Sequence, residues 1–425
     1  MRGTLNTFQK LLLHWREIHP LNAIHAVRLK GTGELDSLRR AFTHSCDRLG
    51  LRGVVFDLEN AAYEYGHGAP PVEAMRLSKP NLASALELEL NRPFPQPPYN
   101  PVRCFLHREA DSQVVGLTYD HWTGDATSLM PLLGQTLCEY LAEPCPASSA
   151  PDLYPPALRH LLRRRLTNEM AARVFLQAIR TYADMRRARR VHHHDPLDLS
   201  NGYLIRPLRP GAYESLRAAA GRVDATVHDL CMAALSRSLA RHLPPYRGIW
   251  RQGIGIGSVA SIRPLVDRQF AEAHGVLLCY LNFVVDKPLR HDLLRLTARI
   301  ARRTRLMKRD HNYLSSLLSF RLGDLTAPYI KPRSHLRFAI RNVPLCGGVS
   351  SFRLTSQNLP RPILDRITAY YRAVNTGPNV PLVVQVAKIR DDAVFGISFR
   401  TTAVERGVAE RIGDGFIGEL KSVIG

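Results

Sequence analysis

The chain has 425 residues, of which 45% are hydrophobic and 22% charged, so its composition excludes a mainly disordered, collagenous or coiled-coil protein. This length is enough for about two or three globular units. The formal net charge is +21, from 58 Lys and Arg against 37 Asp and Glu. Charge alone therefore suggests an acidic partner, an anionic lipid surface or nucleic acid.

The cysteines point to a reducing compartment. There are seven of them, an odd number without paired spacing, which is typical of reduced thiols and predicts a cytoplasmic protein without a disulfide framework. The chain has no run of roughly 18 apolar residues, and Met1 to Trp15 lacks the features of a signal peptide. We therefore expect no transmembrane segment.

The first half of the chain mixes strand-like and helix-like patterns. Strand-like apolar runs cover 24–29, 102–107 and 113–120. Apolar residues at helical spacing predict helices over 33–49 and over 128–141, the second with Ser128 as its N-cap. The polar connector between the last two strand-like runs has the length of a hairpin turn, so these runs should pair.

A change in composition divides the chain. The segment 186–200 is rich in Arg and His and predicts a linker between an N-terminal lobe over 1–185 and a C-terminal lobe over 201–425. Strands are predicted over 203–208, 253–260, 381–389 and 393–399, and helices over 227–242, 293–307 and 404–423. Because these elements do not alternate in regular βαβ units, the predicted fold class is α/β with mixed sheets.

The candidate active site lies in residues 120–126, where His121 and Asp125 follow a predicted strand. The spacing alone is a weak signal, because His107 and Asp111 repeat it. Context favours His121, which extends the apolar alternation of its strand, whereas His107 begins a hairpin turn. A His at a strand end beside a Gly-containing loop can meet a substrate. A purely structural role for His121 stays open at this point.

Residues 120–128 resemble the HHxxxDG segment of condensation domains and related acyltransferases with the chloramphenicol acetyltransferase-like fold. His121 and Asp125 match the second His and the Asp of that segment, whereas Asp120 replaces the first His and Ala126 the following Gly. Further segments resemble this family in the same order: 21–52, 226–229, 261–264 and 279–283. The resemblance covers most of the chain and implies a two-lobed pseudo-dimer with its active site at the lobe interface.

The resemblance also implies roles for three residues. His121 would be the general base, which takes a proton from an alcohol or amine as this nucleophile attacks an acyl thioester. Asp125 would form a salt bridge with Arg263 of the second lobe and so orient the loop. The residues alone leave another reading of Asp125, as a carboxylate that interacts with the N-terminus of the following helix.

The remaining candidate site residues surround this loop. The backbone N–H groups of Trp122, Thr123 and Gly124 are candidates for binding the oxyanion of a tetrahedral intermediate. Tyr119 and Asn282 are candidates for lining a substrate tunnel. No metal ligands are assigned.

The resemblance implies no tightly bound cofactor, with acyl-CoA or a phosphopantetheinyl carrier as co-substrate and a small-molecule alcohol or amine as acceptor. The Arg-rich stretches 159–165, 186–190 and 293–307 are either solvated surface or a contact for the phosphates of CoA or an acidic acyl or peptidyl carrier protein. No specific nucleic-acid partner is expected, because no nucleic-acid-binding motif accompanies the charge. The alternative is a catalytically idle condensation-like protein that binds a carrier or another acidic partner, which Asp120 and Ala126 favour.

Overall fold

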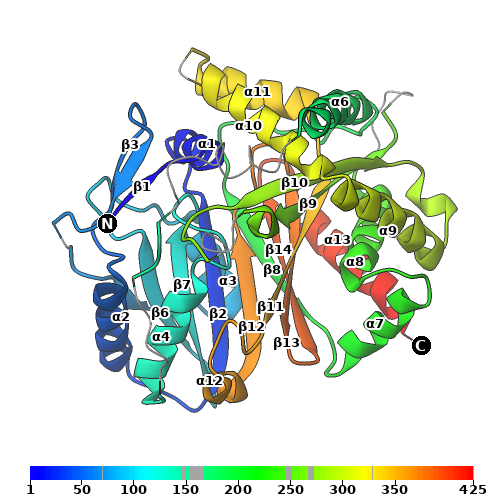
Figure 1. Ribbon diagram of the computed structural model, residues 1–425. Helices are drawn as coiled ribbons and strands as arrows, with labels where there is room; N and C mark the ends of the chain where they lie inside the picture. Colours follow the sequence, from blue (N-terminus) through cyan, green and yellow to red (C-terminus); the bar gives the residue numbers. More distant parts are fainter. Residues whose placement is uncertain are drawn as a thin grey trace.

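The computed structural model of this protein describes residues 1–68, 70–144, 150–153, 167–244, 251–266, 272–327 and 329–424. Within them the chain forms two lobes that lie side by side, each built on one mixed sheet with helices packed on it (Figure 1). The predicted two-lobed fold with mixed sheets is therefore confirmed. The predicted basic stretch within 159–165 lies outside the described residues.

The first lobe contains a five-stranded sheet. In spatial order its strands are β12 (Ile367–Val374), β2 (Asn22–Lys30), β7 (Ser112–Asp120), β6 (Val102–Arg108) and β5 (Ala74–Arg76). All neighbours are antiparallel except β5 and β6. The predicted hairpin of β6 and β7 is present, with His107 opposite Val114.

Helices cover both faces of this sheet. The helices α2 (Leu35–Leu49) and α4 (Met130–Leu141) pack in one core with Val27, Leu106 and Leu117. On the other face, α3 (Leu82–Asn91) packs with Ile24 and Phe105. Since successive side chains of a strand point to opposite faces, each central strand of the sheet contributes to both cores.

The second lobe contains a six-stranded sheet. In spatial order its strands are β10 (Leu278–Val285), β9 (Ile254–Ser261), β11 (Gly347–Leu354), β13 (Leu382–Ile389), β14 (Asp392–Arg400) and β8 (Asn201–Pro207). Its helices include α7 (Ala212–Gly221), α8 (Val227–His242), α9 (Leu293–Arg309) and α13 (Arg406–Lys421). Helix α8 packs against each of the other three. The bounds of α8 match the prediction, because Thr226 and Asp229 form a reciprocal capping box at its start.

A small sheet and five further α-helices are also present in the described chain. They are the three-stranded sheet of β1 (Arg2–Thr4), β4 (Ala62–Glu64) and β3 (Val55–Asp57), and the helices α1 (Thr7–Arg16), α6 (Asn168–Met185), α10 (Ser315–Thr326), α11 (Pro332–Asn342) and α12 (Arg361–Arg366). Figure 1 shows α1, α6, α10 and α11 gathered at one end of the two lobes. Among the described helices, none combines the length and apolar content needed to cross a membrane.

Strand β12 joins the two halves of the chain. It lies inside the segment 201–425, yet it pairs along its length with β2 of the first lobe. Figure 1 shows it beside β2, between the two lobes. The division at 186–200 stays a prediction, and the pairing adds that the later half supplies one strand to the first sheet.

Candidate active site

His121 directly follows the last residue of β7, and its backbone N–H continues the strand pairing by donating to Leu21 O at 3.0 Å. Its half-buried side chain turns back onto its own loop, where Nδ1 lies 3.1 Å from the carbonyl oxygen of Gly124. A carbonyl oxygen can only accept a hydrogen bond, so Nδ1 carries the proton. The other ring nitrogen, Nε2, then has a free lone pair and can act as a base.

The surroundings of His121 keep the imidazole neutral. Burial lowers the pKa of His121 below its ordinary value, because the charged imidazolium loses hydration. The hydrogen bond to Gly124 and the charge of Asp125 raise this pKa, whereas the charge of Arg372 lowers it. The net shift is downward, so Nε2 is unprotonated at neutral pH.

Asp125 and Arg263 form an ion pair across the lobe interface. The Nη2 of Arg263 lies 2.9 Å from both carboxylate oxygens of Asp125, and both side chains are at most 10% exposed. Arg263 Nη1 also donates to Ala273 O at 2.9 Å. On the other side, the backbone N–H of Leu277 donates to Asp125 Oδ2 at 3.1 Å. The aspartate therefore fixes the His121 loop to the second lobe.

Ser128 takes a different role from the predicted one. It is not the N-cap of α4, which begins two residues later with Leu129 as its cap. Its hydroxyl instead contacts Asp125 Oδ1 at 3.1 Å, Gly275 O at 2.8 Å and Arg263 Nη2 at 2.9 Å. Asp125 Oδ1 also accepts from the backbone N–H of Ser128 at 3.0 Å. Asp125 therefore makes both a local contact with the backbone of Ser128 and the ion pair with Arg263 of the second lobe.

Asp120, which stands in the place of the first His, belongs to a buried network. Its Oδ2 accepts from Arg16 Nε at 2.6 Å and from the Tyr99 hydroxyl at 2.7 Å. The Trp122 indole donates in turn to the Tyr99 oxygen at 2.8 Å. Burial raises the pKa of the Asp120 carboxyl, and the Arg16 charge opposes this rise. The replacement therefore introduces an ion pair that anchors the start of the loop.

The loop after His121 has backbone donors available close to the His121 ring. The N–H of Thr123 donates to Asp120 O at 3.0 Å and that of Asp125 to Gly275 O at 3.1 Å. In the described part of the chain, the N–H groups of Trp122 and Gly124 have no acceptor. The Trp122 ring is fully buried and points into the core, so only its backbone is available to a substrate.

The position of Gly124 explains why this residue is small. A Cβ at Gly124 would lie 2.7 Å from the Leu129 side chain and 3.0 Å from Ser128 Cβ.

Ala126, which replaces a glycine of the family pattern, does not have positive φ. Its methyl group therefore causes no backbone strain.

Of the two tunnel candidates, the structure brings Tyr119 to His121. Their ring centroids are 5.8 Å apart at an interplanar angle of 79°. Tyr119 also stacks on His25, with centroids 5.6 Å apart. Asn282 lies on β10 opposite Gly257, and its Oδ1 is buried without a hydrogen-bond partner among the described residues. No contact within that part of the chain joins Asn282 to the His121 loop.

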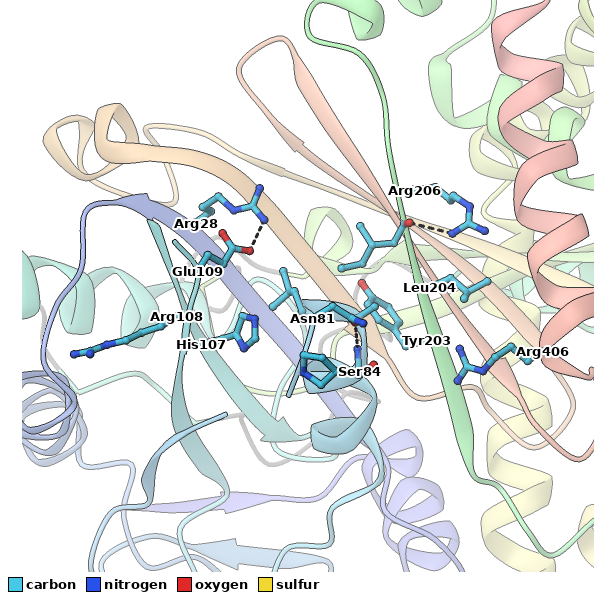
Figure 2. Close-up of a pocket in the computed structure, with 14 residues that line it drawn as sticks. Arg28, Asn81, Ser84, His107, Arg108, Glu109, Tyr203, Leu204, Arg206 and Arg406 are labelled. Atoms are coloured by element: carbon cyan, nitrogen blue, oxygen red, sulfur yellow. Dashed lines mark hydrogen bonds and ion pairs between the residues drawn. The ribbon is translucent and has the colours of Figure 1, made fainter. Parts of the chain in front are cut away.

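The two described cavities lie elsewhere. The larger has a volume of about 680 Å³ and is bordered by His107, Glu109 and several arginines, and the other, of about 540 Å³, by residues of α7, β11 and β13. Figure 2 shows His107, Arg28 and Glu109 around the larger cavity, together with Tyr203 and Arg206 of β8. Neither cavity includes His121, so the predicted tunnel stays a prediction.

Several residues of the site were not found from the sequence. Arg16 and Tyr99 hold Asp120, Ser128 joins the ion pair, and Arg372 influences His121 from β12. The only available signal was Arg372 itself, a single charged residue in the otherwise apolar strand-like run 367–374.

Comparison with known proteins identifies the fold. No protein-family model matches the chain, and no curated protein does so either. Among solved structures it resembles the Trichothecene 15-O-acetyltransferase TRI3 from Fusarium sporotrichioides, with a TM-score of 0.73 and 11% identity over 99% of this chain and 95% of that one. It also resembles the EpoB NRPS cyclization-docking bidomain from Sorangium cellulosum, with a TM-score of 0.72 and 14% identity over 100% and 84% of the two chains.

A third similar structure is the condensation domain from Monacolin K polyketide synthase MokA, with a TM-score of 0.66 and 12% identity over 100% of this chain and 97% of that one. The chain therefore has the chloramphenicol acetyltransferase-like fold that condensation domains and this acetyltransferase share. At such low identities the similarity shows the fold alone, so the activity has to be argued from the site.

Proposed function

We propose that this protein transfers an acyl group from a CoA or carrier-protein thioester to a hydroxyl or amine, with His121 as general base. The observation that carries the proposal is the 3.1 Å hydrogen bond between His121 Nδ1 and Gly124 O, because it leaves Nε2 as a free basic nitrogen. The fold supports the proposal, since an O-acetyltransferase and condensation domains share it.

The residues of the loop fit one reaction sequence. Nε2 of His121 takes the proton from the acceptor O–H or N–H while the acceptor atom bonds to the thioester carbon. The N–H groups of Trp122 and Gly124 are the donors available to the oxyanion that forms. When the C–S bond breaks, the leaving thiolate takes the proton from His121, which regenerates the neutral base. Asp125 acts as a positioning residue, because its carboxylate is engaged by Arg263.

The surface of the second lobe fits an acidic carrier protein or the phosphates of CoA. Helix α9 carries Arg295, Arg299 and Arg302 as exposed side chains. Guanidinium groups bind phosphate and carboxylate groups well. We therefore assign α9 as the first surface to test for donor binding.

The test is a mass-spectrometric product assay. Purified protein is given acyl-CoA and acyl-carrier donors with a cell extract as the source of acceptors, beside the His121→Ala variant. A matched control is His107→Ala, which removes another His of the His-x-x-x-Asp spacing, on the neighbouring strand β6. The proposal expects an acylated product with the wild type and the control but not with His121→Ala, while all three proteins keep the same circular dichroism spectrum.

The alternative is a catalytically idle protein that binds a carrier or another acidic partner. One observation favours it: the position of the first His of the family pattern is occupied by Asp120, which forms an ion pair with Arg16. This alternative predicts that donors bind, that no product forms with any of them, and that His121→Ala leaves donor binding unchanged.

A further inference from the structure

Arg372 is a buried arginine that faces the same side as the candidate active site. It lies on β12 opposite His25 of β2, and its side chain is on the face that Tyr370 shares, whereas Tyr371 and Ala373 point to the other core. Arg372 is only 5% exposed. Charge at such a site is very unfavourable unless a partner compensates for it.

The described residues give Arg372 few partners. Its Nη1 makes one long contact, 3.5 Å from Ser350 Oγ, and its guanidinium lies over the Phe352 ring at 5.3 Å. Its Nε is buried without an acceptor. Within the described part of the chain, no Asp or Glu lies at ion-pair distance from it. A fully hydrogen-bonded guanidinium would have up to five donors engaged.

Three other buried or half-buried arginines of this protein each make at least one short hydrogen bond. Arg103 donates to Glu89 Oε2 at 2.7 Å, and Arg16 to Asp120 Oδ2 at 2.6 Å. Arg400 has no carboxylate but donates to the carbonyl oxygens of Pro378 and Gly377 at 2.8 and 2.7 Å. Among the described residues, Arg372 differs from these three in that its only hydrogen bond is long, 3.5 Å, so its guanidinium has donors available to a ligand.

The groups around Arg372 do not compensate for its charge. Burial and the Arg372 charge together lower the pKa of His25 well below its ordinary value, so His25 is neutral. Burial raises the pKa values of Tyr119 and Tyr370, so their hydroxyls stay protonated. The carboxylate that influences Tyr119, Asp125, is already paired with Arg263. The site therefore has an excess of one positive charge.

This charge lies close to His121. Tyr119 contacts the His121 ring on one side and stacks on His25 on the other, and His25 Nδ1 lies 2.6 Å from the Tyr370 hydroxyl. The Arg372 charge is one of the causes that lower the pKa of His121. Because Arg372 lies opposite His25 and the rings of His25, Tyr119 and His121 follow one another, a group bound by Arg372 would be near the base.

We propose that Arg372 binds a carboxylate of the substrate beside His121, so that either the transferred acyl group or the acceptor carries a carboxylate. A planar guanidinium matches a carboxylate in shape and charge. The phosphate of a pantetheine arm is a poorer candidate, because it lies at the opposite end of the arm from the reacting thioester. This inference rests on the proposed function for the position of the reaction, but its test does not require turnover.

The experiment measures binding by calorimetry to the full-length His121→Ala protein, which prevents turnover. The donor arm compares succinyl-pantetheine with 4-methylpentanoyl-pantetheine, in which an isopropyl group replaces the carboxylate. The acceptor arm compares leucine with leucinamide. We expect the carboxylate ligand of one arm to bind about 10- to 100-fold more tightly than its counterpart without the carboxylate, as for a hydrogen-bonded charged group. The arm that shows this preference identifies the source of the carboxylate.

The same comparison in two further variants assigns the preference. Adding Arg372→Met should reduce the ratio of affinities to near one. Adding Arg353→Met, which removes an equal charge from an exposed position on β11, should leave it unchanged. Equal binding of the ligands with and without a carboxylate in both arms, or a preference that survives Arg372→Met, would overturn the inference.

A second readout concerns stability without ligand. Because an uncompensated buried charge is unfavourable, Arg372→Met should leave Tm unchanged or raise it by about 2 to 4 °C. A fall in Tm of more than about 4 °C would make Arg372 a structural residue and overturn the inference. If the product assay fails but the carboxylate preference is present, the proposed function falls and the binding site stands. If product forms and no preference exists, only this inference falls.

Discussion

His107 and His121 are each followed four residues later by an aspartate, and they lie on opposite faces of the first sheet, His107 within β6 and His121 directly after β7. His107 shares the face of Phe105 and α3, whereas His121 continues the face of Leu117 and Tyr119. Both rings place Nδ1 at 3.1 Å from a backbone carbonyl, of Leu77 and of Gly124 respectively. The local geometry of the two histidines is therefore nearly the same.

What separates them is the aspartate. Asp125 is buried and bonded to Arg263, which lies 138 residues further along the chain. Asp111 is exposed in the hairpin turn between β6 and β7, and none of its described side-chain contacts is an ion pair. The comparison shows that the His-x-x-x-Asp spacing indicates a fixed loop only where a distant residue pairs with the aspartate, as Arg263 pairs with Asp125.

The largest expected difference between the two histidines is in rate. His121→Gln should lower kcat/KM by about 100- to 10,000-fold, because a general base contributes that much. His107→Gln should change it less than threefold, since His107 faces the α3 side of the sheet. Steady-state kinetics with the donor and acceptor found in the product assay measure both. Similar losses in the two variants would remove the distinction between the two faces.

The next difference is in stability. Asp125→Asn should reduce the free energy of unfolding by about 3 kcal/mol, because it leaves the buried Arg263 without its counter-charge. Asp111→Asn, at the exposed turn, should change it by less than about 0.5 kcal/mol. Urea denaturation of the two variants provides the comparison.

A double-mutant cycle of Asp125→Asn and Arg263→Met then isolates the ion pair. Side chains in contact should give an interaction energy of about 1 to 3 kcal/mol. Strictly additive losses would show that the pair makes no energetic contribution, and the positioning role of Asp125 would have to be abandoned.

Much of the fold was readable from local patterns. The capping box of Thr226 and Asp229 fixed the start of α8, and the alternation in 113–120 identified the strand that ends before His121. Such signals lie within a few residues of each other, so a single sequence contains them. The pair of Asp125 and Arg263 was expected only through the family resemblance.

Contacts between distant residues could not be predicted in this way. Strand β12 pairs with β2 although more than three hundred residues separate them, and Arg16 reaches Asp120 over 104 residues. Ser128 fits the pattern of an N-cap equally well, and the approach of Gly275 and Arg263 from the second lobe gives its hydroxyl another role. Local periodicity shows which residues are buried but not which partners bury them.

The comparison extends to the acidic residues beside each histidine. Asp120→Asn should reduce the free energy of unfolding by about 2 kcal/mol, because the fully buried carboxylate holds Arg16 and Tyr99. Glu109→Gln should cost less than about 1 kcal/mol, since Glu109 and its partner Arg28 are partly exposed to solvent. Thermal denaturation ranks the two, and an equal loss would show that burial does not determine the strength of these pairs.

The smallest effect concerns the pH dependence of the rate. The basic form of His121 exists above its pKa, so activity should rise with pH through that pKa and then reach a plateau. Because burial lowers the pKa of His121, the midpoint should lie below 6.5. Arg372→Met should move the midpoint upward, since it removes a positive charge that opposes protonation. The profile of kcat/KM for an alcohol acceptor measures both values, and a midpoint above 6.5 in the wild type would show that the Asp125 charge and the Gly124 carbonyl outweigh burial at His121.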